Sequence, residues 1–224
     1  MDKKASDSSL QTLVFGSLKS GNPIQFAYTS RGSVDIAVGR RGGDMILLKG
    51  VIIVPTLETK RLQLIPFTLD LKKAAMNDRA RLVEMLGVHV PEHWPGPDMV
   101  EALPFFVENM EKAPSEPVWD WIAIHRSDQR VLGGIGFMGG PDKDGVVEVG
   151  YDIVPEYRKQ GYATEMARSL IAWTFQETDI KVVTASCLDD NIGSIKVLEN
   201  VGMSRLKPDG NMLKWAIRKD NWAT

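Results

Sequence analysis

The chain has 224 residues, of which 43% are hydrophobic and 25% charged, and its formal net charge is −2. This length fits one globular domain with a sizeable core, or one domain with an appendage, and the composition is that of an ordinary soluble protein. The slightly negative charge argues against a protein that coats nucleic acid, because such proteins are strongly basic. A single cysteine, Cys187, excludes an internal disulfide framework and indicates a cytoplasmic protein. The longest apolar run near the N-terminus, residues 45–55, contains Lys49 and is too short to span a membrane.

Residues 1–55 are predicted to form a β-rich extension. The first eight residues are charged and Ser-rich, and no regular structure is expected there. Short apolar pieces separated by Gly, Ser and Asn follow, and this pattern favours strands and hairpins. The pieces lie at residues 13–15, 24–28, 34–38 and 45–48. None of them carries recognisable chemistry, so we expect a small appendage that packs on the main domain or on a neighbouring subunit, with regulatory ligand binding as the alternative.

Residues 56–224 form the predicted main domain, which begins with a strand and a helix. Apolar and polar residues alternate over 59–67, as in a half-buried strand. Over 71–86 the apolar residues fall largely on one helical face, with Asp70 as the expected N-cap and Gly87 at the end.

A proline-rich loop and a second helix come next. Residues 89–97 contain three prolines, too many for regular structure, and a helix is expected from 98 to about 112. His89 and His93 have the four-residue spacing of two metal ligands on one helical face. The prolines prevent that helix and no third ligand is obvious, so we expect no metal site.

Three strands joined by turns are then expected, over residues 119–124, 131–138 and 146–153. Residues 134–139 satisfy the dinucleotide pattern G-x-G-x-x-G, but residues 141–145 form a turn where such a site needs a helix. Glycines in paired strands favour close packing or a bulge instead. The turn also lacks the distal glutamate of a calcium loop.

Residues 154–164 contain the clearest functional signal, a basic loop between the third of these strands and a helix expected over 165–176. The start of a helix leaves backbone N–H groups without partners and carries roughly half a positive charge, so a phosphate can bind there. Gly161 allows the backbone to approach a phosphate oxygen, and Arg158 and Lys159 add positive charge. The sequence therefore predicts a phosphate-binding loop.

The C-terminal part is predicted to contain a strand, a helix and a hairpin. Their expected ranges are 181–188 for the strand, 191–200 for the helix, and 203–206 and 212–217 for the hairpin. Asn191 is the expected N-cap of the helix, and Gly202 ends it. Trp173 and Phe175, on the helix 165–176, are expected to pack on the sheet.

Two motifs resemble the coenzyme A-binding motifs of the GNAT acetyltransferase superfamily. Arg158-x-x-Gly161-x-Ala163, followed by Thr164, is similar to the loop that binds the pyrophosphate of acetyl-coenzyme A. Residues 191–203 resemble the second motif, N-x-x-S-x-x-V-x-E-x-x-G-F, with a methionine at the Phe position.

The opening strand of the main domain also resembles this superfamily. Residues 59–66 match the T-x-R-L-x-L-x-P opening of the branch that acetylates ribosomal proteins. The resemblance covers about residues 56–221 and implies an α/β (α+β) GNAT fold, with a mixed, mostly antiparallel sheet flanked by helices.

The resemblance implies acetyl transfer from acetyl-coenzyme A to a primary amine, either a protein N-terminus or a small molecule. The donor would contact Ile153, Val154, Arg158, Lys159, Gln160, Gly161, Tyr162, Ala163, Thr164, Asn191 and Ser194. Nucleic acid, membrane and metal are not expected as partners, and a homodimer is left open.

Three further residues are assigned to the acceptor side. Glu148 is polar among apolar neighbours on its strand, which suits either an exposed carboxylate or, as the resemblance implies, a residue at the acceptor. The family's acceptor site is lined by the connection between its first two helices, so Trp94 and its neighbours are candidates for substrate selection, and Tyr151 is a further candidate.

Direct acetyl transfer needs a base, an oxyanion site and an acid. Glu148 is the candidate base that deprotonates the amine. Pro155 predicts a break in strand pairing near residues 153–154, which would free N–H groups for the thioester. Many family members use a Tyr of the last helix as the acid, but residues 191–202 contain no Tyr, and the ribosomal-protein branch points to Ser194. The alternative function is a sensor or scaffold that binds acetyl-coenzyme A without turnover.

Overall fold

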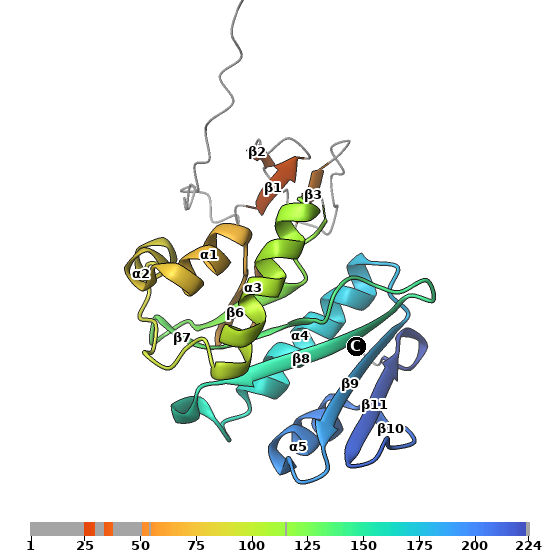
Figure 1. The fold of residues 1–224 in the computed structure, drawn as a ribbon. Coiled ribbons are helices and arrows are strands. Elements are labelled where there is room, and N and C mark those ends of the chain that lie inside the picture. The colour runs from red at the N-terminus through yellow and green to blue at the C-terminus, as the bar shows by residue number, and fades with distance from the viewer. Residues whose placement is uncertain (1–24, 30–33, 38–50, 54, 115, 223–224) are drawn as a thin grey trace, which may run out of the picture. The chain divides into compact units, whose positions relative to one another are not determined.

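The computed structural model describes residues 25–29, 34–37, 51–53, 55–114 and 116–222 (Figure 1). The chain divides into two compact units, residues 1–55 with 112–117 and residues 56–111 with 118–224.

The described strands of the first unit form a three-stranded antiparallel sheet in the order β2-β1-β3. Its strands are β1 Gln25–Thr29, β2 Val34–Ala37 and β3 Val51–Ile53. β1 and β2 lie at two of the expected apolar pieces, and the expected pieces 13–15 and 45–48 lie outside the described residues. The role of this extension stays a prediction.

The second unit contains an eight-stranded sheet in the order β10-β11-β9-β8-β7-β6-β5-β4. Its strands are β4 Leu57–Glu58, β5 Leu62–Pro66, β6 Asp120–His125, β7 Arg130–Phe137, β8 Val146–Ile153, β9 Val182–Leu188, β10 Ser204–Arg205 and β11 Met212–Arg218. β8 and β9 are parallel and the other neighbouring strands are antiparallel, which confirms the mixed, mostly antiparallel sheet.

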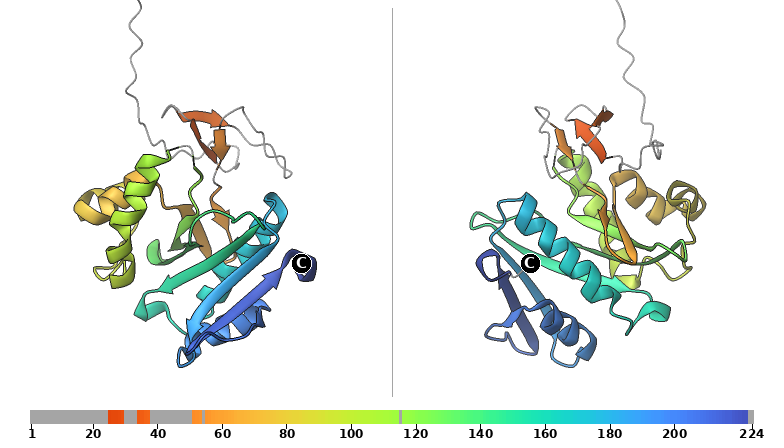
Figure 2. Two further views of the ribbon diagram at one scale, coloured as in Figure 1. Left: turned by 45° about the vertical axis from the view of Figure 1, so that its right-hand side comes forward. Right: turned by 180° about the vertical axis from the view of Figure 1, so that it is seen from behind.

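Helices cover both faces of this sheet. They are α1 Leu69–Asn77, α2 Arg79–Leu86, α3 Pro97–Lys112, α4 Tyr162–Glu177 and α5 Ile192–Val201, with short 3-10 helices η1 Pro155–Tyr157 and η2 Lys219–Asn221. α3 crosses the sheet on the side facing the viewer in Figure 1, and α4 lies on the opposite side, where the view from behind shows it in front (Figure 2). No helix of the described chain has the length and apolar character needed to cross a membrane.

Three expectations for the start of this unit are wrong. The single helix expected over 71–86 is two helices, because Asp78 leaves the helical conformation at φ −150° and its carboxylate caps α2 at the N–H of Arg81. Thr68, not Asp70, caps α1. The strand expected over 59–67 is shorter at its N-terminal end, because Thr59 lies in the turn that joins β4 to β5. Its N–H donates to the carbonyl of Leu62, and its Oγ1 accepts from the Leu62 N–H.

The β7 glycines allow close strand packing, as predicted. A Cβ added at Gly133 would lie 2.1 Å from the carbonyl oxygen of Asp152 on β8. At Gly136 it would lie 2.4 Å from the Cβ of Asp120 on β6. The β6–β7 register also shifts between Ala123 and Ile124, so this strand pair contains an irregularity next to the glycines.

The core lies between the sheet and its helices and contains one buried ion pair. Trp173 of α4 packs edge-on against Trp121 of β6, at 5.4 Å between ring centroids, as expected for the helix after the loop. Lys72 of α1 is 1% exposed, pairs with the Asp120 carboxylate at 2.7 Å and donates to the carbonyl of Phe67. Burial lowers the pKa of Lys72 and raises that of Asp120, and the attraction between the two opposes both changes.

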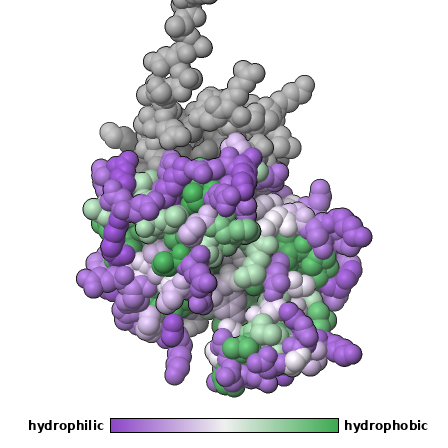
Figure 3. Space-filling model, in the orientation of Figure 1, coloured by the Kyte–Doolittle hydropathy of each residue, from purple (hydrophilic) through white to green (hydrophobic). Residues whose placement is uncertain are grey.

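On the face shown in Figure 3, the described surface is largely hydrophilic and its hydrophobic residues lie in separate groups. Exposed apolar side chains include Val100 and Phe105 of α3 and Met138 at the end of β7.

Candidate active site

β8 and β9 separate part of the way along their length. They pair where Val146, Val147 and Glu148 lie opposite residues 182–184, and the described residues show no further pairing between the two strands. The opening therefore begins after Glu148, about five residues before the break expected at 153–154.

The backbone of β8 presents donors to this opening. Met138 donates to the carbonyl of Glu148 and Val154 donates to the carbonyl of Leu132, both at 2.8 Å, so the even-numbered residues of β8 bond to β7. The N–H groups of Tyr151 and Ile153 therefore face the opening. The N–H of Val154 is already engaged, contrary to the expectation that it is free.

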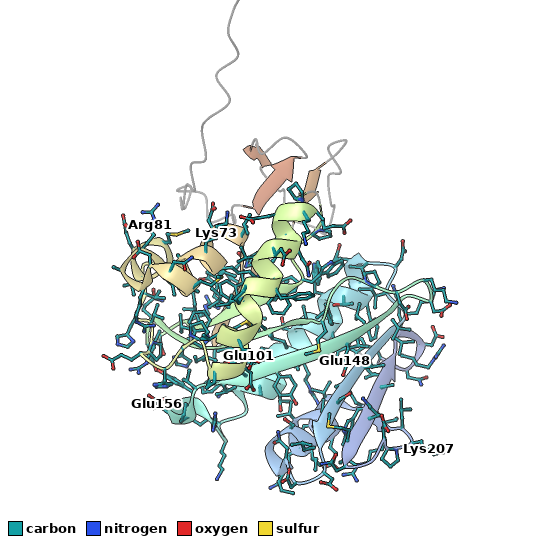
Figure 4. All side chains as sticks on the ribbon, in the orientation of Figure 1. Lys73, Arg81, Glu101, Glu148, Glu156 and Lys207 are labelled. Atoms are coloured by element: carbon teal, nitrogen blue, oxygen red, sulfur yellow. The ribbon has the colours of Figure 1, made fainter. Side chains whose placement is uncertain are left out.

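Glu148 is the third residue of β8 and occupies the last position that pairs with β9 (Figure 4). Its Oε1 accepts a hydrogen bond from Ser186 Oγ of β9 at 2.6 Å. Ser186 Oγ in turn accepts from Lys214 Nζ of β11 at 3.0 Å. The candidate base is therefore held on the side of β9 by a hydroxyl and an ammonium from two neighbouring strands.

α5 lies close to the opposite edge of the opening. Asn191 caps this helix as predicted, with its Oδ1 accepting from the N–H of Ser194 at 3.0 Å. The hydroxyl of Tyr151 donates to the carbonyl of Ser194 at 3.4 Å. Burial raises the pKa of Tyr151 to about 12, so the phenol keeps its proton at neutral pH. Tyr151 and Ser194, predicted for different roles, thus lie together.

The basic loop leads from η1 into α4. The helix begins at Tyr162, three residues before the expected start, because Gly161 takes the left-handed conformation at φ 82° and serves as its N-cap. Among the described residues no side chain caps this end, so the first-turn N–H groups of Tyr162, Ala163 and Thr164 have no side-chain partner there. Lys159 also has a positive φ, 60°, and is exposed.

Other loop residues are tied to the neighbouring backbone. Arg158 Nε donates to the carbonyl of Ile153 at 2.9 Å, and Gln160 Nε2 donates to that of Glu156 at 3.0 Å. The loop residues predicted to contact acetyl-coenzyme A therefore follow directly on the end of β8.

A cluster of rings supports this loop from the turn between β6 and β7. His125 Nε2 lies 3.0 Å from the Tyr162 hydroxyl, and Tyr157 donates to Asp128 Oδ2 at 2.6 Å. The His125 Nδ1 is 3.1 Å from the same carboxylate oxygen. The bond from Tyr157 is the main cause that lowers the pKa of Asp128. Residues on both sides of the loop are therefore fixed to one hairpin turn.

The segment expected to select the acceptor is fixed by Arg79. Its guanidinium donates to the carbonyls of Val90, Pro91 and Trp94 at 2.8, 2.5 and 3.0 Å. Trp94 itself is 3% exposed and packs against Phe67 at 5.7 Å between ring centroids. In this conformation the indole therefore supports the loop, and its role in substrate selection stays a prediction.

A second carboxylate lies on the same face of β8 as Glu148. Asp152 alternates in phase with Glu148 and faces Gly134 of β7, where an added Cβ would be 3.2 Å from Asp152 Oδ1. Burial raises the pKa of Asp152 to about 6, although a backbone hydrogen bond from Gly134 and the charge of Arg158 oppose the increase. Sequence reasoning missed this residue, because burial of a carboxylate leaves no local pattern.

Metal ligands do not gather in the part of the chain that the structure describes, which contains no group of three or more His, Cys, Asp or Glu side chains arranged to hold an ion. His93 instead pairs with Glu156 of η1 at 3.0 Å.

The sequence of this chain is similar to those of known proteins. The sequence model described as "Acetyltransferase (GNAT) domain" matches residues 61–204. The chain is 35% identical over 147 residues to the "Uncharacterized N-acetyltransferase YjdG" of Bacillus subtilis, a match that covers 65% of this chain and 88% of that protein.

Solved structures share the fold. The GNAT-family acetyltransferase of Bacillus anthracis superposes with a TM-score of 0.52 at 22% identity, over 75% of this chain and all of that one. A putative ribosomal-protein-serine acetyltransferase of Vibrio cholerae has a TM-score of 0.52 at 19% identity, over 73% of this chain and 97% of that one.

Proposed function

Because the chain belongs to the GNAT acetyltransferase family, we propose that it transfers the acetyl group of acetyl-coenzyme A to a primary amine by direct attack. The observation that carries this proposal is the opening between β8 and β9, which has a carboxylate at its narrow end and leads into a helix start without a side-chain cap. Such an opening can take a linear amide chain, and such a helix end favours phosphate.

Donor binding is supported by two sets of groups. The pyrophosphate would accept hydrogen bonds from the first-turn N–H groups of α4, with Arg158 and Lys159 supplying charge. The pantetheine arm would lie in the opening, against the N–H groups of Tyr151 and Ile153 and the first turn of α5 with Asn191.

Glu148 is the proposed base. An ammonium is not a nucleophile, so its proton must be removed before it attacks the thioester carbon. The hydrogen bond from Ser186 fixes Oε1 and leaves Oε2 able to accept a proton directly or through water. Holding the amine and the thioester together at this point of the strand would supply much of the rate enhancement.

The oxyanion and the leaving thiolate need donors. The N–H groups of β8 that face the opening support the first role, because backbone donors held in a sheet need no reorganisation during the reaction. Ser194 stays the proposed acid, with water as the alternative. The hydroxyl of Tyr151 lies beside the same turn of α5, where its proton is donated to the carbonyl of Ser194.

The acceptor is proposed to be a protein N-terminus or a small-molecule amine in the cytoplasm, where a single buried cysteine is unremarkable. A homodimer is compatible with this reaction and is not required by it.

The test is release of free thiol from acetyl-coenzyme A across a panel of amines and N-terminal peptides. Glu148→Gln should lower kcat at least about 100-fold, the usual contribution of a general base, and leave coenzyme A affinity unchanged. Glu111→Gln is the matched control, because Glu111 is an exposed glutamate of α3 that pairs with Lys73.

Three results would change the proposal. Tight coenzyme A binding without thiol release from any amine would favour the sensor function. Full activity of Glu148→Gln would remove the assigned base. Coenzyme A affinity that is absent, or that is unaltered by Gly161→Glu, would reject the donor site.

A further inference from the structure

Arg61, which directly precedes β5, contacts both the basic loop and the first turn of α4. We propose that Arg61 is a positioning residue of this basic loop, which is the proposed donor loop. Arg61 holds Gln160 and Tyr162 in place and, besides Arg158 and Lys159, keeps a third cation beside the phosphate-binding N–H groups. This inference rests on the proposed donor site and assigns to it a residue about 100 positions away in the chain.

The carboxylate of Glu165 fixes the Arg61 side chain. Glu165 Oε2 lies 2.6 Å from Arg61 Nε, and Oε1 accepts from the Arg61 N–H at 2.9 Å and from Thr59 Oγ1 at 2.6 Å. Burial would raise the pKa of Glu165, but these hydrogen bonds and the charge of Arg61 outweigh it and hold the pKa below its usual value. The carboxylate is therefore ionised at neutral pH and the guanidinium has little freedom to move.

From this anchor the guanidinium reaches three consecutive residues at the start of the helix. Arg61 Nη1 donates to the carbonyl of Gln160 at 3.0 Å. Arg61 Nη2 is 3.6 Å from the position that a Cβ on Gly161 would take. The guanidinium carbon lies 4.0 Å from the centroid of the Tyr162 ring. Arg61 therefore contacts the loop at the residues whose conformation directs the first N–H groups of α4.

The Tyr162 ring that Arg61 contacts is held in place. Tyr162 is 7% exposed, and its hydroxyl is 3.0 Å from His125 Nε2, so its ring has little room to turn. A cation stacked on a fixed ring keeps its position at a modest entropic cost.

Charge gives Arg61 a second effect on the loop. Glu165 lies in the first turn of α4, where its negative charge would repel a phosphate bound to the same turn. The Arg61 guanidinium neutralises it at 2.6 Å while remaining 36% exposed at the side chain, so one residue removes the repulsion and adds a donor. A hydrophobic residue at this position would lose both effects.

The test measures the affinity of the full chain for coenzyme A and for dephospho-coenzyme A by titration calorimetry. Arg61→Met should raise both dissociation constants at least tenfold, because both ligands carry the pyrophosphate. Arg205→Met is the matched control, since Arg205 also combines an ion pair, at 3.1 Å to Glu199, with a ring contact, at 4.8 Å to Trp215. Its affinities should stay within twofold of the wild type.

Two further variants separate the possible causes. The double variant Arg61→Met with Glu165→Gln should keep at least a fivefold loss, because the contacts with Gln160 and Tyr162 are still missing. Arg61→Lys retains a cation and should lose affinity severalfold, and it serves as the measurement if the methionine variant does not fold.

Failure of this inference differs from failure of the donor site. Wild-type protein that does not bind coenzyme A would reject the donor site itself. With wild-type binding intact, the inference is overturned by any of three results: unchanged affinity in Arg61→Met, equal losses in Arg61→Met and Arg205→Met, or full recovery in the double variant. A loss confined to coenzyme A would assign Arg61 to the 3′-phosphate and would also overturn it.

Discussion

Asp152→Asn should make the protein more stable at neutral pH and should change how its stability depends on pH. Asp152 of β8 is half-buried beside Gly134 of β7, and burial raises the pKa of its carboxyl from 3.8 to about 6. Asp98 of α3 adds to the increase, and the charge of Arg158 opposes it. An asparagine has nearly the same shape as the protonated carboxyl and stays neutral at every pH.

The sign follows from the protons bound in each state. Between pH 3.8 and about 6 the folded protein holds the Asp152 proton more tightly than the unfolded chain. Its free energy of unfolding therefore falls as the pH rises through this range. The difference of roughly two pKa units corresponds to at most about 3 kcal/mol, at about 1.4 kcal/mol per unit.

Urea denaturation of both proteins at several pH values between 4 and 8 measures this difference. The free energies of unfolding should agree near pH 4, and the variant should exceed the wild type by up to about 3 kcal/mol at pH 8. Asp189→Asn, at an exposed position after β9, provides the control and should show no such trend. If the difference in the free energy of unfolding between Asp152→Asn and the wild type does not vary with pH, the raised pKa of Asp152 in the folded protein is refuted.

Three other substitutions test separate parts of the structure. Asp120→Asn should lower the free energy of unfolding by about 3–5 kcal/mol, because it leaves the buried Lys72 without a counter-ion, and a loss below about 1 kcal/mol in urea denaturation would contradict a strong pair. Gly136→Ala should lower the free energy of unfolding by about 1–3 kcal/mol in thermal unfolding, since the added Cβ would lie 2.4 Å from Asp120. Gly150→Ala is the control and should be tolerated, because its Cβ would lie 3.8 Å from the nearest atom. Equal effects of the two substitutions would refute the packing argument. Arg79→Met should raise the KM for the amine severalfold, because it removes the hydrogen bonds that hold the carbonyls of residues 90–94. The affinity for coenzyme A should stay unchanged. A change in coenzyme A affinity alone would place this loop on the donor side instead.

Local patterns predicted much of this fold. β8 spans Val146–Ile153, the range expected from its alternation, and α5 is capped by Asn191 and ended by Gly202 as predicted. The predicted helix 71–86 failed because one side chain, that of Asp78, caps a new helix inside an otherwise continuous amphipathic pattern.

The supports of the donor loop were not predictable in the same way. Loop residues such as Gly161 can be recognised in the sequence from their type and spacing. Arg61, in the turn before β5, and His125, at the end of β6, reach the loop from parts of the chain that are distant in sequence. Nothing local to either residue indicates its partner. Sequence reasoning therefore identified the residues proposed to contact the donor and missed those that hold them in place.

The parted strands have a consequence for the exchange of amide hydrogens. Tyr151 and Ile153 lie in the interior of an eight-stranded sheet, yet their N–H groups face a gap where an unbroken ladder would continue. Without a bound partner these two amides should exchange with solvent as if they stood at the outer edge of a sheet, while their neighbours Asp152 and Val154 stay protected. A ligand that fills the gap with its own amides would then act as a missing strand, and its binding could be followed residue by residue before any acceptor is known.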